Sequence, residues 1–278
     1  MIARLAVVLL MLTVFVGSAS AKSGAYLGHL TWPEAEERIR QAPIVILPFG
    51  AGAKEHGPHL PMDADRVVME YLLERAVETQ PVVIAPPILH GWFPAFRAFP
   101  GTEVADPQVF ADYVMQVALS LVRQGAQRIV FLNTGISKAT GLPLSIVARE
   151  IRVQTGVPTL VISWDDLETD EVLEIQEQES GGHADEIETS INLFLQADKV
   201  RMSEAARDGG TAAPKDYGGY RPGLFSRDPQ DPRHSETGVF GDPTLATADK
   251  GRRVLEIMTA EWLKALSGFA ETPRKASR

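Results

Sequence analysis

The side chains best suited to chemistry gather first in the segment from Lys54 to Asp65. Its histidines and carboxylates lie close together along the chain: Glu55, His56, His59, Asp63 and Asp65. The chain has no cysteine, so any metal site must use imidazole nitrogens and carboxylate oxygens, which suit zinc or manganese. A bound divalent ion lowers the pKa of its water toward neutrality and allows hydrolysis of a stable bond. The alternative is an ordinary loop in which these side chains cap helices, since Asp65 stands where a helix is expected to begin.

A second group of such side chains follows a glycine pair at residues 181–182. His183 precedes an expected helix, and Glu186 and Glu188 fall in its first turns. The functional interpretation makes His183 a general acid/base or a metal ligand, oriented by one of the two glutamates. The structural alternative is that acidic residues near a helix N-terminus only interact favourably with the helix dipole. The other histidines outside these two groups, His29, His90 and His234, are weaker candidates.

Both groups need a scaffold, and the apolar pattern indicates one. Short apolar runs alternate with segments of helical spacing: strands at 44–48, 82–85, 128–132 and 159–163, and helices at 65–78, 106–123, 142–154, 184–195 and 246–266. This alternation predicts an α/β fold with a mainly parallel sheet and helices on both faces. Ligands of such sheets bind beyond the carboxyl ends of the strands. The segment from Lys54 follows one strand end, and a third polar cluster, 133–138, follows another.

The N-terminal 21 residues are expected to leave the mature protein. Arg4 precedes an apolar run from Leu5 to Val16, and the segment closes on Ala19-Ser20-Ala21. A basic start, a short apolar core and this ending are typical of a secretory signal peptide. The prediction is therefore a periplasmic or secreted protein with one domain over residues 22–278. Within that domain, residues 208–243 lose regular spacing, which indicates either a disordered linker or an ordered excursion near the site or an oligomer interface.

Composition narrows the range of functions. The chain has 278 residues and a formal net charge of −9, so it has no general attraction for the phosphate backbone of nucleic acids. After the first 21 residues no apolar stretch is long enough to span a bilayer, and no membrane association is expected once the signal peptide is removed. These exclusions leave a small molecule as the expected partner of the two polar groups.

Taken in order, the motifs resemble those of the creatininase (creatinine amidohydrolase) family. The carriers of the resemblance are Leu47-Pro48-Phe49-Gly50, Glu55-His56-Gly57-Pro58-His59-Leu60-Pro61, Phe99-Pro100-Gly101-Thr102, His183-Ala184-Asp185-Glu186-Ile187-Glu188-Thr189-Ser190 and the segment 238–251. The resemblance covers nearly the whole mature chain. It implies a three-layer α/β sandwich, a homo-oligomer that is often a hexamer, and a centre of one or two metal ions that hydrolyses C–N bonds in linear or cyclic amides.

Carried over residue by residue, the resemblance makes His56 and Asp65 metal ligands and places His183 near the substrate. The family's first glutamate ligand falls on Lys54, but the chain has one extra residue before His56, so Glu55 is an alternative source of that carboxylate. The predicted ligand set is therefore Glu55, His56 and Asp65, and the predicted catalytic set is His183 with Glu186 and Glu188.

Three positions depart from the family pattern. Gly135 and Ser137 stand where the family has a histidine ligand and often a carboxylate. Phe96 ends the stretch Phe93-Pro94-Ala95-Phe96, which has no ionisable group where the family often has Ser-x-Glu-His. Because two divalent ions need several anionic ligands to offset their repulsion, at most one ion is expected. Lys54 could take over the charge of a metal by pairing with Asp65. The sequence thus predicts a secreted amidohydrolase that uses at most one divalent ion, zinc or manganese.

Two alternatives remain open at this point. One is a catalytically degenerate relative that binds a small molecule or a partner without hydrolysis. The other is a structural oligomer in which His56, His59 and Asp65 only cap helices and form hydrogen bonds.

Overall fold

The computed structural model describes residues 23–135, 137–208, 226–230 and 234–273. A parallel sheet of five strands forms its centre, in the order β1-β3-β2-β4-β5. The strands are β1 Ala25–Tyr26, β2 Ile44–Phe49, β3 Val82–Ile84, β4 Ile129–Asn133 and β5 Thr159–Ser163. The expected parallel α/β architecture is confirmed. The expected signal peptide lies outside the described residues and stays a prediction.

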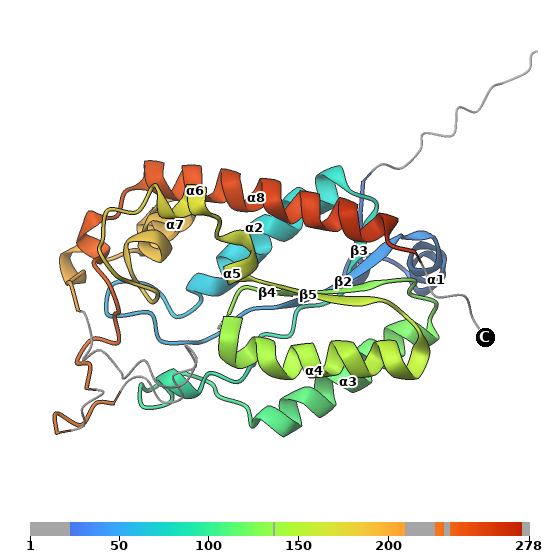
Figure 1. The fold of residues 1–278 in the computed structure, drawn as a ribbon, viewed down its shortest axis with the longest axis horizontal. Coiled ribbons are helices and arrows are strands. Elements are labelled where there is room, and N and C mark those ends of the chain that lie inside the picture. The colour runs from blue at the N-terminus through green and yellow to red at the C-terminus, as the bar shows by residue number, and fades with distance from the viewer. Residues whose placement is uncertain (1–22, 136, 209–225, 231–233, 274–278) are drawn as a thin grey trace, which may run out of the picture.

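Helices cover both faces of the sheet and complete three layers. Figure 1 shows α2 Ala64–Thr79, α7 Glu186–Gln196 and α8 Ala248–Glu271 on one face, with α3 Pro107–Arg123 and α4 Ser137–Thr155 on the other. The shorter helices are α1 Trp32–Gln41, α5 Trp164–Leu167 and α6 Asp170–Leu173. Among the described residues, no helix is both long and apolar enough to cross a membrane.

Strand alternation divides the core between these two faces. Ile44 and Ile46 of β2 pack into the core under α2 and α8, whereas Val45 and Leu47 pack into the core with α3 and α4. Successive side chains of a strand point to opposite faces, so a strand buried on both sides reads as a continuous apolar run. This is why β2 could be identified from its sequence alone.

The element boundaries differ from expectation mainly where polar residues begin a helix. The helix expected from Leu142 begins at Ser137 instead and contains Pro143 in its second turn. The helix expected from Ala184 begins at Glu186, because Asp185 caps it by accepting hydrogen bonds from the backbone N–H groups of Ile187 and Glu188. Side-chain capping explains the second difference, whereas the first arises because α4 continues through Pro143, a residue type that usually kinks or ends a helix interior.

Part of the irregular segment 208–243 is an ordered excursion to the site. The backbones of His183 and Phe240 exchange two hydrogen bonds, and Asp208 pairs in the same way with Gly241. Gly238 lies against the Glu55 carboxylate with a φ of 80°, and a Cβ atom there would fall 2.2 Å from Glu55 Oε1. Only glycine fits this approach and this backbone conformation. Residues 209–225 and 231–233 lie outside the described part of the chain.

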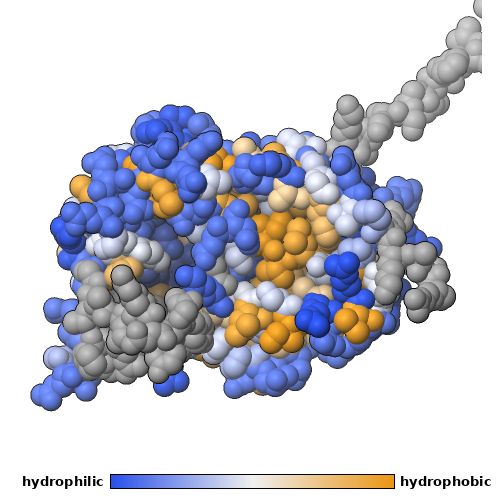
Figure 2. Space-filling view, viewed as in Figure 1, coloured by the Kyte–Doolittle hydropathy of each residue, from blue (hydrophilic) through white to orange (hydrophobic). Residues whose placement is uncertain are grey.

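Several apolar side chains of α4 face solvent. Leu142, Ile146 and Val153 are 53%, 56% and 71% exposed. Figure 2 shows apolar surface over α4 and beside the sheet. Apolar surface of this kind is common at contacts between protein copies. The homo-oligomer expected from the sequence stays a prediction.

Helix α7 is held in place by a close crossing with helix α8. At Gly251 of α8 an added Cβ atom would lie 2.0 Å from the carbonyl oxygen of Ser190 in α7. The Ser190 hydroxyl also accepts a hydrogen bond from the Thr247 N–H at the start of α8. The two helices thus meet backbone to backbone, without an intervening side chain at this point.

We predict that Gly251→Ala lowers the free energy of unfolding by about 1–3 kcal/mol, because α8 must move away from α7. Gly268→Ala is the matched control on the same helix, where a Cβ atom would meet nothing within 4 Å. Alanine is the better helix former, so this control should raise the free energy of unfolding by up to about 1 kcal/mol. Urea unfolding followed by circular dichroism measures both. Equal effects of the two substitutions would contradict the crossing.

Candidate active site

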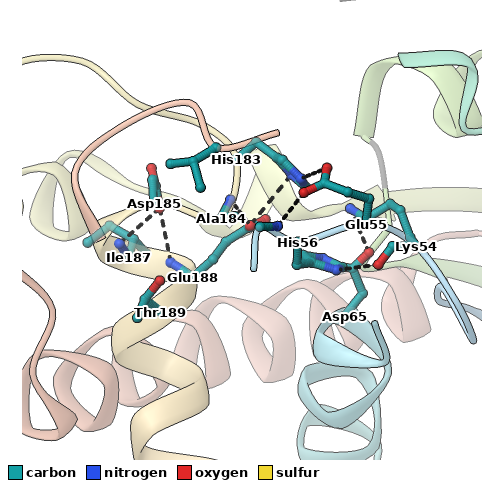
Figure 3. A network of polar contacts seen from close by, with 12 residues as sticks. Lys54, Glu55, His56, Asp65, His183, Ala184, Asp185, Ile187, Glu188 and Thr189 are labelled. Atoms are coloured by element: carbon teal, nitrogen blue, oxygen red, sulfur yellow. Dashed lines mark hydrogen bonds and ion pairs between the residues drawn. The ribbon is translucent and has the colours of Figure 1, made fainter. Parts of the chain in front are cut away.

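The two polar groups of the sequence meet at the carboxyl ends of the central strands. The segment from Lys54 to Asp65 connects β2 to α2, and the segment with His183 leads into α7. Figure 3 shows Glu55, His56 and Asp65 from the first segment facing His183 and Glu188 from the second. The position is the one expected for a ligand site on a parallel sheet.

Asp65 is the centre of the first set of contacts. Its Oδ2 atom lies 2.8 Å from the Lys54 ammonium nitrogen, and its Oδ1 atom lies 2.9 Å from His56 Nε2. The side chains of all three residues are buried. Burial alone would raise the pKa of Asp65, but the neighbouring Lys54 and His56 hold it well below its usual range. Asp65 is therefore an ionised carboxylate with a partner on each oxygen.

His56 lies between two hydrogen-bond acceptors. Its Nδ1 atom is 2.8 Å from the carbonyl oxygen of Lys54, and its Nε2 atom faces Asp65. Burial lowers the pKa of His56, but the Asp65 carboxylate outweighs this and raises it. A doubly protonated imidazolium at this position can donate to both acceptors. A metal ion at His56 would have to displace one of these protons.

His183 is the centre of the second set of contacts. Its Nε2 atom lies 3.0 Å from Glu55 Oε2, and its Nδ1 atom lies 3.7 Å from Glu188 Oε2. Burial would raise the pKa of Glu55, but His183, the backbone N–H of Gly57 and His56 lower it overall. Glu188 is held by the backbone N–H of Ala184 at 2.6 Å. His183 thus lies between two fixed carboxylates.

Aromatic side chains form one wall of the site. The Phe96 ring lies 4.0 Å from the His183 ring between centroids, and the His56 and His183 rings are 5.2 Å apart. Phe96 belongs to an apolar cluster with Phe93 and Phe99. Where the sequence showed only the absence of an ionisable group, the structure places an apolar surface that covers His183.

One combination of these side chains could hold a metal ion. His56, His183 and Glu188 each offer one ligand atom, and these atoms lie within 4.8 Å of one another. Two imidazoles and one carboxylate are a ligand set of catalytic zinc sites, which keep a position for water. Of the ligands expected from the sequence, only His56 belongs to this set. Glu55 pairs with His183 instead, and Asp65 pairs with Lys54 and His56.

The structure brings Glu188 to His183 but places Glu186 elsewhere. Glu186 is fully buried, and its Oε2 atom accepts hydrogen bonds from the backbone N–H groups of Glu177 and Gln178. Its Oε1 atom pairs with Lys250 of α8 at 2.5 Å. These contacts anchor α7 and do not match the catalytic role expected for Glu186.

His59 and the third polar cluster, residues 133–138, are less directly involved in the candidate site. His59 Nε2 lies 2.8 Å from the hydroxyl oxygen of Thr189 and ties the first segment to α7. Burial lowers the pKa of His59 to about 4, which keeps its imidazole neutral near pH 7. Gly135, at the family's histidine position, is partly buried next to Phe93. The side chain of Ser137 lies outside the described part of the structure.

Glu168 is an acidic residue near the site that the sequence did not indicate. Burial raises its pKa to about 7, and the negative charges of Asp185, Asp165 and Glu188 add to the shift. Glu168 follows α5 in a short connection, where neither a motif nor apolar spacing marks it. More acidic side chains therefore lie near Glu188 than the motif around His183 contains.

The fold and the site together define the class of protein: a three-layer α/β protein with imidazole and carboxylate side chains converging at the carboxyl edge of a parallel sheet. The family model described as creatininase, creatinine amidohydrolase, matches residues 28–266. The chain belongs to this family. The resemblance of the motifs is confirmed.

The similar proteins of known activity differ in substrate. The chain is 26% identical over 261 residues to the 3-dehydro-scyllo-inosose hydrolase of Thermotoga maritima, covering 85% of this chain and 80% of that one. It is 27% identical over 264 residues to the mycofactocin precursor peptide peptidase of Mycolicibacterium smegmatis, covering 85% and 92%. It is 26% identical over 251 residues to the creatinine amidohydrolase of Pseudomonas putida, covering 84% and 92%.

Solved creatininase structures have the same fold. A manganese creatininase has a TM-score of 0.73 at 24% identity, covering 90% of this chain and all of that one. A mutant creatininase of the Zn-Zn type has a TM-score of 0.74 at 24% identity, covering 89% and 98%. At this level of identity the likeness shows the three-layer fold alone.

The raised pKa of Glu168 leads to a prediction about stability and pH. The unfolded chain ionises this group near 4.5 and the folded protein near 7, so its favourable contribution is present at low pH and lost as the pH rises through about 7. Glu168→Gln should therefore raise the free energy of unfolding by roughly 1 kcal/mol at about pH 8.5 and change it little at about pH 5.

Urea unfolding of metal-free protein at both pH values measures this difference. The control is Glu171→Gln, which removes an exposed carboxylate of the nearby α6. An equal effect of Glu168→Gln at the two pH values would show that Glu168 is not buried among negative charges.

Proposed function

We propose that the protein is a hydrolase that cleaves a C–N bond of a small amide or cyclic amide with the help of one divalent ion, zinc or manganese. The observation that carries the proposal is the convergence of His56, His183 and Glu188 within 4.8 Å. Membership of the creatininase family supports it, as do the metal names of the similar solved structures.

The donor set fits one ion. Two imidazoles and one carboxylate are sufficient ligands for zinc at a catalytic centre, and further acidic side chains nearby favour a cation. Glu188 is held by the Ala184 N–H, and its Oε2 atom lies 3.7 Å from His183 Nδ1, too far for a hydrogen bond between them. When bound, such an ion activates a water molecule as the nucleophile and polarises the substrate carbonyl.

We assign His183 to the ligand set and not to free acid–base work, in contrast to the role expected from the sequence. The reason is its contact with Glu55, which accepts a hydrogen bond from Nε2 at 3.0 Å. A carboxylate that binds the second ring nitrogen of a histidine fixes its tautomer and leaves the other nitrogen for a metal. Glu55 is then the residue that orients His183.

The remaining side chains shape the substrate position. Phe96 covers the His183 ring and excludes water from one side of it, and Phe93 and Phe99 extend this apolar wall. A dry wall strengthens electrostatic interactions at the centre. It also favours a substrate with an apolar face next to its amide, which is consistent with a small cyclic amide.

We predict that Glu188→Gln weakens zinc or manganese binding by about a hundredfold or more, because it removes one of three ligands. Glu186→Gln is the matched control two residues away, and it should retain the ion. It should instead lower the free energy of unfolding by about 1–3 kcal/mol, because the buried contacts to Lys250 and the backbone are weakened.

Metal content after dialysis, measured by elemental analysis, separates the two variants. Release of amine from a panel of cyclic amides, creatinine and short peptides tests the activity of the metal-loaded wild type, with the Glu188 variant as the control. Metal retention in Glu188→Gln would reject the site. A wild type with neither metal nor activity would favour the alternative of a relative that binds a small molecule or partner without hydrolysis.

We also propose that the protein is secreted. The support is the sequence of residues 1–21, with Arg4, an apolar run and the ending Ala19-Ser20-Ala21. Expression in a bacterium should yield periplasmic protein whose N-terminus is Lys22, as measured by intact mass. Ala21→Arg should block cleavage and leave the longer chain. Periplasmic protein that retains Met1 would contradict the proposal.

A further inference from the structure

The site contains a cation of its own. Lys54 is 2% exposed, and its ammonium nitrogen lies 2.8 Å from Asp65 Oδ2. The backbone N–H of Lys54 donates to the carbonyl oxygen of Met62 at 3.0 Å, which holds the residue in place. The Phe96 ring lies 5.3 Å from the same ammonium nitrogen. A lysine this deeply buried is stable only beside an opposite charge.

The charges around Lys54 suggest how many metal ions the centre can hold. Three carboxylates surround the two imidazoles: Glu55, Asp65 and Glu188. Lys54 neutralises one of these negative charges, and one divalent ion neutralises the other two when both imidazoles are neutral. A second divalent ion would leave the buried centre with excess positive charge, which is costly at low dielectric constant.

The contacts of Asp65 also limit the centre to one metal ion. A second ion would need oxygen ligands beyond those of Glu188. Of the two buried carboxylates of the first segment, Glu55 already binds His183 and the Gly57 N–H, which leaves Asp65. One of its oxygens faces the Lys54 ammonium and the other faces His56. An ion could bind there only by displacing the Lys54 ammonium, which is buried and lies beside the Phe96 ring.

We infer that the Lys54 ammonium is a built-in cation that takes the place of a second metal ion on Asp65 and restricts the centre to a single ion. This inference rests on the proposed function in one respect, namely that the centre binds an ion at His56, His183 and Glu188. It adds a role for Lys54 in setting the number of ions. Lys54 acts through its positive charge and by occupying the position of a second ion on Asp65, and it is not itself a metal ligand.

The test is a titration of purified, chelator-treated protein with Mn²⁺, in which the number of ions per chain is measured by calorimetry and by elemental analysis. The key variant is Lys54→Glu, which replaces the cation with a carboxylate beside Asp65. We expect about one ion per chain for the wild type and about two for Lys54→Glu. Lys264→Glu is the matched control, because it makes the same charge change at an exposed position near the end of α8, far along that helix from the site. It should bind as many ions as the wild type.

A second readout keeps the test valid if Lys54→Glu folds poorly without metal. Its melting temperature should rise with Mn²⁺ more than that of the wild type, because the ion relieves repulsion between two buried carboxylates. Lys54→Met, which removes the charge without adding a ligand, should lower the melting temperature and show a smaller response to Mn²⁺ than Lys54→Glu.

The outcomes separate this inference from the proposed function. Two ions in the wild type, or equal numbers in the wild type and Lys54→Glu, would overturn the inference. A wild type without an ion would reject the proposed function. If the wild type binds no ion, binding of one ion by Lys54→Glu would still support the exclusion of metal by Lys54. If Lys54→Glu also binds no ion, the inference about Lys54 is overturned.

Discussion

Buried negative charge is the constraint on which the rest of the site depends. Asp65, Glu55 and Glu188 lie together at the carboxyl end of a sheet whose central strands are buried on both faces. Taking a carboxylate out of water is costly unless a cation or hydrogen-bond donors compensate it. Lys54 and His56 compensate Asp65, and His183 with the Gly57 N–H compensates Glu55. Nearly every polar contact at the site follows from this requirement.

The layers of the fold bring these charges together and keep water away from them. α7 is held by its backbone contact with α8 at Gly251 and by the buried pair of Glu186 and Lys250. Gly238 allows the segment before η6 (Pro243–Leu245) to pack directly on Glu55. These supporting residues take no part in the proposed chemistry, but their contacts fix the positions of the side chains that do. Such supporting contacts are what hold ligand atoms at a fixed separation.

The departures from the family pattern form a consistent set. Phe96 replaces polar residues with an apolar wall over His183, and Lys54 supplies a positive charge at the position of a glutamate ligand. Gly135 leaves no side chain at the family's histidine position. In the proposed single-ion centre, each of these changes removes a ligand that a second ion would use or a need for that ligand. The similar proteins act on an inosose, a peptide and creatinine, which shows that this fold accommodates different substrates.

The sequence by itself determined the parallel α/β fold and the two segments that carry chemistry. Apolar runs and helical spacing are local properties, and the motifs from Glu55 and from His183 are contiguous. Only the tertiary structure decided which charges meet. Residues two apart on a helix point about 200° away from each other, so Glu188 faces His183 while Glu186 faces Lys250. The pairing of Glu55 with His183 joins residues on two different segments. No local pattern in the sequence contains that contact, because packing of α7 against the sheet creates it.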